Sequence, residues 1–249
     1  MIELPKYPRT FHLEGSKGIK DPDAIVPSSI AGKFLVVEEK MDGSMVWLAF
    51  DSNGKLLIGH RNQEVSGSEF DLLKSWAASI EEDLFDMLED RYVMYGEWLW
   101  AKHTIFYDRL VHYFLEYDIY DRKENIWLDT SSRYDLLNRK HIVSVRILQA
   151  EKTGLSDLSK QAKSSAYISS VVKDNELMKS ANVIKETDLS GLMEGLYIKV
   201  EENGRVVERY KYIRKGFLDI ILGSGTHWKD RPVIINQLTP GARERIHGF

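Results

Sequence analysis

The chain has 249 residues, of which 43% are hydrophobic and 11% aromatic, and its formal net charge is −4. This composition is typical of a folded globular protein whose core is large enough to need no disulfides or structural metals. The absence of cysteine excludes disulfides, thiolate zinc sites and cysteine nucleophiles. No apolar run approaches the roughly 20 residues of a membrane helix, and the first residues contain no apolar signal core. We therefore expect a cytoplasmic protein without membrane contact.

Charge is unevenly distributed along the chain. Residues 80–90 are strongly acidic, whereas residues 205–249 contain nine Lys and Arg against four Asp and Glu. A basic end on an acidic protein permits a local phosphate-binding face, although a solvated surface explains the same charges equally well.

The first predicted elements are two runs of β-forming residues, KFLVVEEK (33–40) and SMVWLAFD (44–51). Only MDG separates them, which predicts that they pair as a hairpin. An Asn-Gly turn within residues 51–55 then leads into a third strand, LLIGHR (56–61), because Asn-Gly accepts the positive φ of a tight hairpin turn.

The rest of the chain is predicted to mix helices and antiparallel strands. Apolar residues at helical spacing predict a helix over residues 68–90 with Ser68 as its N-cap. Further helices are predicted over 131–141, 155–173 and 216–222, and further strands over 91–101, 111–121, 144–149 and on both sides of the EENG turn (201–204). This order indicates an α+β fold rich in antiparallel sheet, with flanking helices.

Lys40 is the first candidate for chemistry, because it ends a predicted strand between acidic residues and is followed by Asp42 and Gly43. Strand alternation places Glu38 and Lys40 on one face and Glu39 on the other. A neutral lysine amine is a good nucleophile, but at its usual pKa of about 10.4 it is protonated at neutral pH. Burial and nearby cations, including a metal, lower that pKa. Taken alone, these residues are more often an ordinary hairpin with a solvent-reaching lysine.

The sequence K-x-D-G at residues 40–43 resembles the nucleophile motif of the covalent nucleotidyltransferases, the superfamily of polynucleotide ligases and mRNA capping enzymes. Further segments resemble this superfamily's motifs in the same order: GHRNQEV with Arg61, YGEWLW with Glu97, FLEYDIYD with Tyr117 and Asp118, EGLYIKV with Glu194 and Lys199, and ERYKYIRK with Lys211. EEKMDGS, FLEYDIYD and the early KYPRTFHLEGS are similar to the RNA ligase branch. The resemblance implies an adenylyltransferase domain over residues 1–235, a short tail over 236–249, an ATP-grasp-like ligase fold and no C-terminal OB-fold.

By this resemblance the protein is an ATP-dependent RNA ligase that forms a lysyl-AMP intermediate. It transfers AMP to an RNA 5′-phosphate and joins that end to a 3′-hydroxyl. The implied catalytic residues are Lys40, Asp42, Glu194, Lys199 and Lys211. The implied nucleotide-binding residues are Glu39, Lys40, Arg61, Glu97, Tyr117, Lys199, Arg209 and Lys211.

The resemblance also implies individual roles. Lys40 accepts AMP, Glu97 binds a ribose hydroxyl, and Tyr117 stacks on adenine. Glu194 holds Mg²⁺ or Mn²⁺, chiefly through water, because Mg²⁺ keeps much of its hydration shell. Lys199 and Lys211 face the AMP phosphate. The final basic strand departs from the family's K-x-K pattern, so the register of Arg209, Lys211 and Arg214 stays open.

Two alternatives remain at this stage. The chain could be a DNA nick ligase or guanylyltransferase of the same superfamily, or a nucleotide- or RNA-end-binding module without sealing activity. The expected partners are RNA ends and an end-healing kinase or phosphatase, and we expect a monomer. The kind of RNA break is left open.

Overall fold

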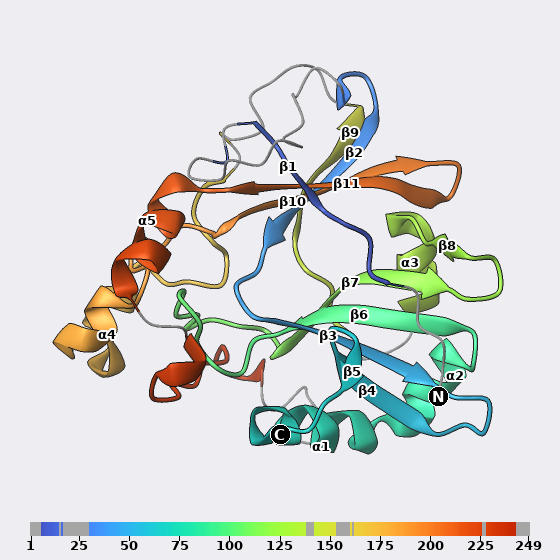
Figure 1. Cartoon of the computed structure of the whole chain (residues 1–249), viewed down its shortest axis with the longest axis horizontal. Coiled ribbons are helices and arrows are strands. Elements are labelled where there is room, and N and C mark those ends of the chain that lie inside the picture. The colour runs from blue at the N-terminus through green and yellow to red at the C-terminus, as the bar shows by residue number, and fades with distance from the viewer. Residues whose placement is uncertain are drawn as a thin grey trace.

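The computed structural model describes residues 6–14, 16, 30–137, 142–152, 160, 162–225 and 228–242. Two β-sheets form its body (Figure 1). The five-stranded sheet has the order β1 (Phe11–His12), β11 (Arg205–Ile213), β10 (Gly195–Glu202), β2 (Phe34–Lys40) and β9 (Ile147–Lys152). The six-stranded sheet has the order β5 (Gln63–Glu64), β4 (Leu56–His60), β3 (Ser44–Phe50), β6 (Tyr92–Trp98), β7 (Phe114–Asp121) and β8 (Ile126–Trp127).

Neighbouring strands in both sheets are antiparallel except for the short parallel pair β1 and β11. The predicted α+β class with antiparallel sheets is therefore confirmed.

The segment between β2 and β3 is not a hairpin turn, so this sequence prediction was wrong. Strand β2 pairs with β10 and β9, whereas β3 pairs with β4 and β6. Both strands have partners on both sides, so neither has an edge free for the other. Residues 41–43 instead carry the chain from one sheet to the other.

Gly43 is required at this crossover by space rather than by a turn conformation. A Cβ atom at this position would lie 2.7 Å from the backbone oxygen of Trp98 and 2.7 Å from Cδ2 of Leu99. Any side chain would therefore push β3 away from the end of β6, which narrows the choice of residue to glycine.

The two predicted Asn-Gly hairpins are confirmed. Gly54 adopts a φ of 75° in the connection between β3 and β4, where the Asp51 carboxylate accepts hydrogen bonds from the amides of Asn53 and Lys55. Asn203 and Gly204 adopt φ values of 52° and 77° between β10 and β11. Both turns use the positive φ that a tight hairpin demands.

The predicted helix over residues 68–90 is divided into three parts. A 3₁₀ turn (η2, Ser68–Phe70) precedes α1 (Asp71–Ser79), and α2 (Glu81–Leu88) follows a break at Ile80. Gly67 is the N-cap of the 3₁₀ turn and Phe70 that of α1, so the predicted N-cap role of Ser68 was wrong. The break lets both helices pack on the six-stranded sheet in one core, whose members include Leu48, Phe50, Leu73, Trp76, Leu84 and Leu88 (Figure 1).

The later helices agree in part with prediction. Helix α3 (Thr130–Leu137) covers the described part of the predicted 131–141 helix, since residues 138–141 lie outside the described residues. Helix α5 (Lys215–Ser224) confirms the helix predicted over 216–222. Residues 153–159 and 161 of the third segment are also outside the described part.

Residues 162–173 of that segment contain no α-helix and only the start of a 3₁₀ turn (η4, Val172–Asp174). Serine side chains in this segment form hydrogen bonds with nearby backbone groups, which compete with helix formation. The Ser165 hydroxyl, for example, accepts a hydrogen bond from the backbone amide of Tyr167. A second 3₁₀ turn (η5, Glu176–Met178) and the short α4 (Ala181–Lys185) follow. No helix in the described part of the chain is long and apolar enough to cross a membrane.

Residues 228–242, which begin with a 3₁₀ turn (η6, Trp228–Asp230), pack against the loop that connects β6 to β7. The Asn236 side chain accepts the amide of Tyr107 at 2.9 Å and donates to the carbonyl of Leu99 at 2.8 Å. The described part of the expected tail, residues 236–242, is thus packed on the body, and the domain boundary at 235 stays a prediction.

Candidate active site

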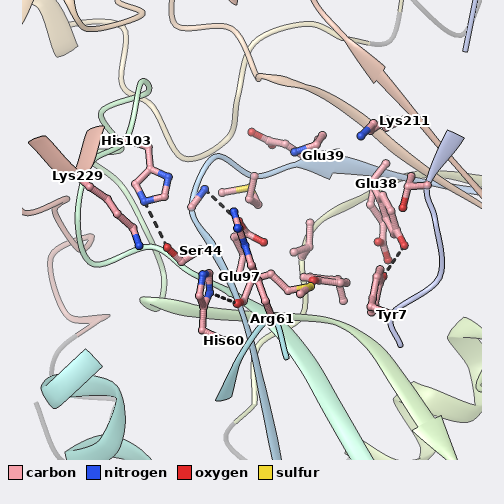
Figure 2. A pocket seen from close by; sticks show the side chains of 18 residues that line it. Tyr7, Glu38, Glu39, Ser44, His60, Arg61, Glu97, His103, Lys211 and Lys229 are labelled. Atoms are coloured by element: carbon pink, nitrogen blue, oxygen red, sulfur yellow. Dashed lines mark hydrogen bonds between the residues drawn. The ribbon is translucent and has the colours of Figure 1, made fainter. Parts of the chain in front are cut away.

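A cavity of about 380 Å³ opens where β2 passes into β3, between the two sheets (Figure 2). Its lining comes from both sheets, from the segment before β1 and from the segment after α5. Of the residues predicted from sequence, the cavity wall contains Glu39, Lys40, Arg61, Glu97, Tyr117 and Lys211. The fold therefore brings together side chains that are far apart in the sequence, such as Glu39 and Lys211, which are 172 positions apart.

Lys40 ends β2 inside this cavity, with 27% of its side chain exposed. Its Nζ lies 2.9 Å from Oε1 of Glu194, the residue that precedes β10. Burial lowers the pKa of Lys40, but the carboxylates of Glu194, Glu97 and Asp42 outweigh burial and raise it. Without ligands the amine is therefore protonated, because burial alone does not produce the lowered pKa that the sequence led us to expect from burial together with a metal.

Glu97 and Glu194 approach Lys40 from opposite sheets. Glu97 belongs to β6 and its Oε1 accepts the amide of Gly43 at 3.1 Å. Burial raises its pKa to about 8, helped by repulsion from Glu194 and Asp42 and opposed by Lys40. Burial likewise raises the pKa of Glu194 to about 7, although Lys40 opposes this shift. Because these carboxylates repel one another, they bind a proton or a nearby cation more readily than an isolated carboxylate does.

The raised pKa of Glu97 predicts a pH-dependent stability of the ligand-free protein. The unfolded-state pKa of glutamate is about 4.3, so between that pH and about 8 the folded protein binds the extra proton. Its free energy of unfolding therefore falls as the pH rises through this window. In Glu97→Gln this fall should shrink by on the order of 2 kcal/mol between pH 5 and pH 9, measured by urea unfolding. Glu151→Gln, an exposed change on β9, should leave the fall intact, and an equal fall in Glu97→Gln would contradict the assignment.

Asp42 does not line the cavity, and its contacts are with the loop that follows β6. Its Oδ2 accepts the amides of Thr104 and Ile105, both at 2.7 Å, and its own amide donates to the hydroxyl of Tyr107 at 2.9 Å. Asp42 thereby fixes the crossover against this loop, a contact that its position in the sequence did not reveal.

Tyrosines form one end of the cavity. Tyr117 on β7 and Tyr197 on β10 come from different sheets and meet edge to face, with ring centroids 5.8 Å apart and ring planes at 62°. Tyr7 joins them from the segment before β1, where its hydroxyl donates to Asp118 and lies 2.7 Å from the hydroxyl of Tyr197. Sequence reasoning had given a role only to Tyr117, although Tyr7 lies in the segment KYPRTFHLEGS that resembles the RNA ligase branch.

Lys199 and Arg209 are placed behind the cavity wall rather than in it. Lys199 is fully buried, with its Nζ 2.9 Å from Oε1 of Glu38 and 3.5 Å from Oδ1 of Asp118. The Nε of Arg209 lies 3.1 Å from Oδ2 of Asp118, and its guanidinium stacks 4.5 Å from the ring of Trp127. These placements differ from the sequence prediction, in which both residues faced the nucleotide, because each cation neutralises a buried carboxylate.

The same network continues to Arg133 on α3. Arg133 is fully buried and binds Glu116 through two nitrogens, at 2.8 and 2.9 Å, while its Nη1 lies 3.4 Å from Oε1 of Glu38. Glu38 also lines the cavity, so the network joins the site to both sheets and α3.

The remaining predicted residues divide between cavity and interior. Arg61 adopts a φ of 54° after β4, and its carbonyl accepts the indole of Trp47 at 3.0 Å, so it faces the cavity from a strained turn. Glu39 is buried, and burial raises its pKa to about 7. Arg214 instead pairs with Asp188 and donates to the carbonyl of Met193, so it lies outside the lining.

The donor set around Lys40 fits a hard divalent cation. Glu194, Glu97 and Asp42 interact with one another strongly enough to shift the pKa of the glutamates, and extra positive charge would relieve this repulsion. In the part of the chain that the structure describes, no three His, Asp or Glu side chains are arranged as a complete metal site. Mg²⁺ commonly keeps several of its waters when it binds to one or two carboxylates of a protein.

A family model described as RNA ligase matches residues 33–213. The chain belongs to the RNA ligase family, within the covalent nucleotidyltransferase superfamily. The matched segment contains the cavity except for Tyr7, Thr10 and Lys229. No curated protein matches the chain.

Solved structures of Naegleria gruberi RNA ligase have a similar fold. A variant with AMP and Mn has a TM-score of 0.54 and 16% identity, with 78% of this chain and 53% of that chain covered. Another variant with AMP and Mn has a TM-score of 0.56 and 16% identity, covering 87% and 59%. The ligase with PPi has a TM-score of 0.53 and 18% identity, covering 82% and 54%. The match thus spans little more than half of these ligases.

Proposed function

We propose that this protein is an ATP-dependent RNA ligase that acts through a lysyl-AMP intermediate on Lys40. The observation that supports this most directly is the position of the Lys40 amine. It lies at the junction of two sheets, inside a cavity whose one end is aromatic and whose wall contains Glu97 and Lys211. The aromatic rings at one end can stack on a purine base. The ammonium groups of Lys40 and Lys211 can bind a phosphate. Membership of the RNA ligase family supports the same activity.

In the first step the lone pair of the Lys40 amine attacks the α-phosphorus of ATP. A nitrogen–phosphorus bond forms, the bond from the α-phosphorus to its bridging oxygen breaks, and pyrophosphate leaves. The amine must first lose its proton to water, which the nearby carboxylates of Glu194 and Glu97 oppose. When bound at Glu194, a magnesium or manganese ion supplies positive charge that offsets these carboxylates and lowers the pKa of Lys40.

In the second step a 5′-phosphate oxygen of RNA attacks the same phosphorus, the nitrogen–phosphorus bond breaks, and Lys40 recovers its proton. In the third step a 3′-hydroxyl attacks the activated 5′-phosphate and AMP leaves. All three are displacements at phosphorus, so the protein contributes mainly position and charge.

The other cavity residues have matching roles in this proposal. Tyr117 would stack on adenine, and Tyr197, whose ring meets that of Tyr117 edge to face, would support it from the other sheet. Glu97 would accept a hydrogen bond from a ribose hydroxyl and Lys211 would neutralise the AMP phosphate. Asp42, Lys199 and Arg209 act indirectly, because they hold the crossover and the strands that carry Lys40 and Tyr197.

The test is to incubate the protein with ATP labelled at the α-phosphate, Mg²⁺ or Mn²⁺, and then nicked duplexes. We expect label on the denatured protein, and sealing that requires ribose at the 3′ side of the nick. Label from GTP in place of ATP would indicate a guanylyltransferase, equal sealing of deoxyribose nicks would exclude the RNA assignment, and an unlabelled protein in every metal would contradict the proposal.

A further inference from the structure

The cavity has a second end, opposite in chemistry to its tyrosines. Figure 2 shows Tyr7 and Glu38 on one side, Glu97 near the middle, and His103, Lys229 and His60 on the other side. The cationic and imidazole side chains at that side, together with Arg61, all belong to the cavity wall. Of these four, His60 and Arg61 lie in the family-like segment GHRNQEV, and only Arg61 was given a role there.

Lys229 reaches the cavity because its segment is tied to the loop after β6. The guanidinium of Arg231 donates to the carbonyls of Glu186 at 3.2 Å and His103 at 3.5 Å, and to the hydroxyl of Ser224 at 2.9 Å. These bonds join η6, the end of α5 and the loop of His103. Lys229, which is itself exposed, is thereby held at the mouth of the cavity.

His103 lies beside Asp42 of the crossover and Ser44 at the start of β3. Its Nε2 lies 3.5 Å from the hydroxyl of Ser44 and its Nδ1 lies 4.0 Å from Oδ1 of Asp42. The backbone carbonyl of His103 also accepts the buried ammonium of Lys102 at 3.1 Å. The ring is buried, so it presents a fixed polar edge to the cavity.

Two cationic side chains, Arg61 and Lys229, share this end of the cavity wall with His60. His60 donates its Nδ1 hydrogen to the carbonyl of Met45 at 2.8 Å, which fixes its ring. Burial lowers the pKa of His60, the bond to Met45 and the charge of Glu69 oppose this shift, and the charges of Arg61 and Lys229 add to it. A polyanion entering the cavity would be attracted to this end.

We propose that Lys229 and His103, with Ser44, form a phosphate subsite next to the reacting α-phosphate. It holds the pyrophosphate of ATP in the first step and the 5′-phosphate of RNA in the second. This inference rests on the proposed function. An in-line displacement at phosphorus requires the leaving group of the first step and the attacking group of the second to lie opposite Lys40. Both groups are phosphates, so one subsite serves both steps.

Lys229 and His103 would contribute differently to the subsite. An exposed lysine supplies a mobile point charge that also attracts the anion, whereas a buried, oriented imidazole supplies direction. Neither contacts the nucleobase end of the cavity, which lies on the side of Tyr7 (Figure 2). Loss of either should therefore weaken phosphate binding and leave AMP binding unchanged.

The first test measures binding of inorganic pyrophosphate and of AMP to the full chain by titration calorimetry. Lys229→Ala and His103→Ala should each weaken pyrophosphate binding by about tenfold or more and change AMP binding by less than about twofold. Lys229→Arg should recover most of the lost affinity. Lys123→Ala, an exposed lysine in the turn after β7, is the matched control and should have no effect. Unchanged pyrophosphate affinity in both alanine variants would overturn the proposal.

The second test uses the preformed lysyl-AMP protein, offered either pyrophosphate or a 5′-phosphorylated RNA. In Lys229→Ala both ATP formation and AMP transfer to RNA should slow by about tenfold at subsaturating acceptor. Slowing with pyrophosphate alone would overturn the shared subsite. A wild-type protein that forms no lysyl-AMP would contradict the proposed function, while the calorimetric result would still decide whether the subsite exists.

Discussion

Lys40→Ala should lower covalent labelling from α-labelled ATP by at least about a thousandfold, the largest effect expected of any single change in this protein. The variant lacks the only atom that forms the nitrogen–phosphorus bond in the proposed reaction. It also removes the cation 2.9 Å from Glu194, so the two remaining glutamates should take up protons more readily. The measurement is radiolabel retained on the denatured protein after incubation with ATP and Mg²⁺.

Lys40→Arg separates the nucleophile from its charge. Arginine keeps a cation beside Glu194 but does not deprotonate in proteins, so it has no lone pair for the attack. This variant should fold like the wild type and remain unlabelled. Lys55→Ala, at the exposed turn between β3 and β4, should be labelled normally. Substantial label on Lys40→Arg would show that another residue accepts AMP.

Arg133→Ala should lower the free energy of unfolding by about 3–5 kcal/mol, the largest effect expected on stability. Arg133 is fully buried and neutralises Glu116 through two short hydrogen bonds and Glu38 through a longer one. Its removal leaves carboxylate charge in the interior, although Ser144 still donates to Glu116 and Lys199 still pairs with Glu38. Urea unfolding at pH 7 measures the difference.

An exposed ion pair provides the contrast for this prediction. Lys74 and Asp71 on α1 are 3.0 Å apart at the surface, and Lys74→Ala should change stability by less than about 0.5 kcal/mol. The double variant Arg133→Met, Glu116→Leu should be more stable than Arg133→Ala, because it removes an unpaired charge together with its former partner. A cost below about 1 kcal/mol for Arg133→Ala would mean that water reaches the network.

Much of the fold could be predicted from local pattern, because most strands carry β-forming residues and both Asn-Gly turns require positive φ. The crossover at Asp42 and Gly43 could not be predicted, because the residues that favour a hairpin turn also favour a short connection between two sheets. What distinguishes the two is the pairing of β2 with β10, residues that lie about 160 positions away. Helix breaks such as that at Ile80 likewise depend on the sheet beneath them.

Much of the candidate site could be predicted as well, because a series of family-like segments marks Lys40, Glu97, Tyr117 and Lys211. The series does not distinguish a residue in the cavity wall from one that supports the wall from behind. Lys199 and Arg209 were therefore expected in the wall, whereas both are buried behind it. His103 and Lys229 lack any local signature, and the family-like segment that contains Tyr7 did not mark it as a cavity residue. Each enters the site only through long-range packing of a connecting segment.

The order of strands also has a consequence for biosynthesis. The six-stranded sheet is formed by the continuous stretch from β3 to β8, so it can close as soon as that stretch has been made. Strand β2 is made earlier, yet both of its neighbours, β9 and β10, follow β8 in the chain. Strand β2, which is largely apolar and ends in Lys40, therefore stays unpaired until the second half of the chain has been translated. Pairing across so long a separation is slow, and an exposed strand edge is prone to aggregate. The nascent chain is thus most exposed to aggregation at the strand that ends in Lys40.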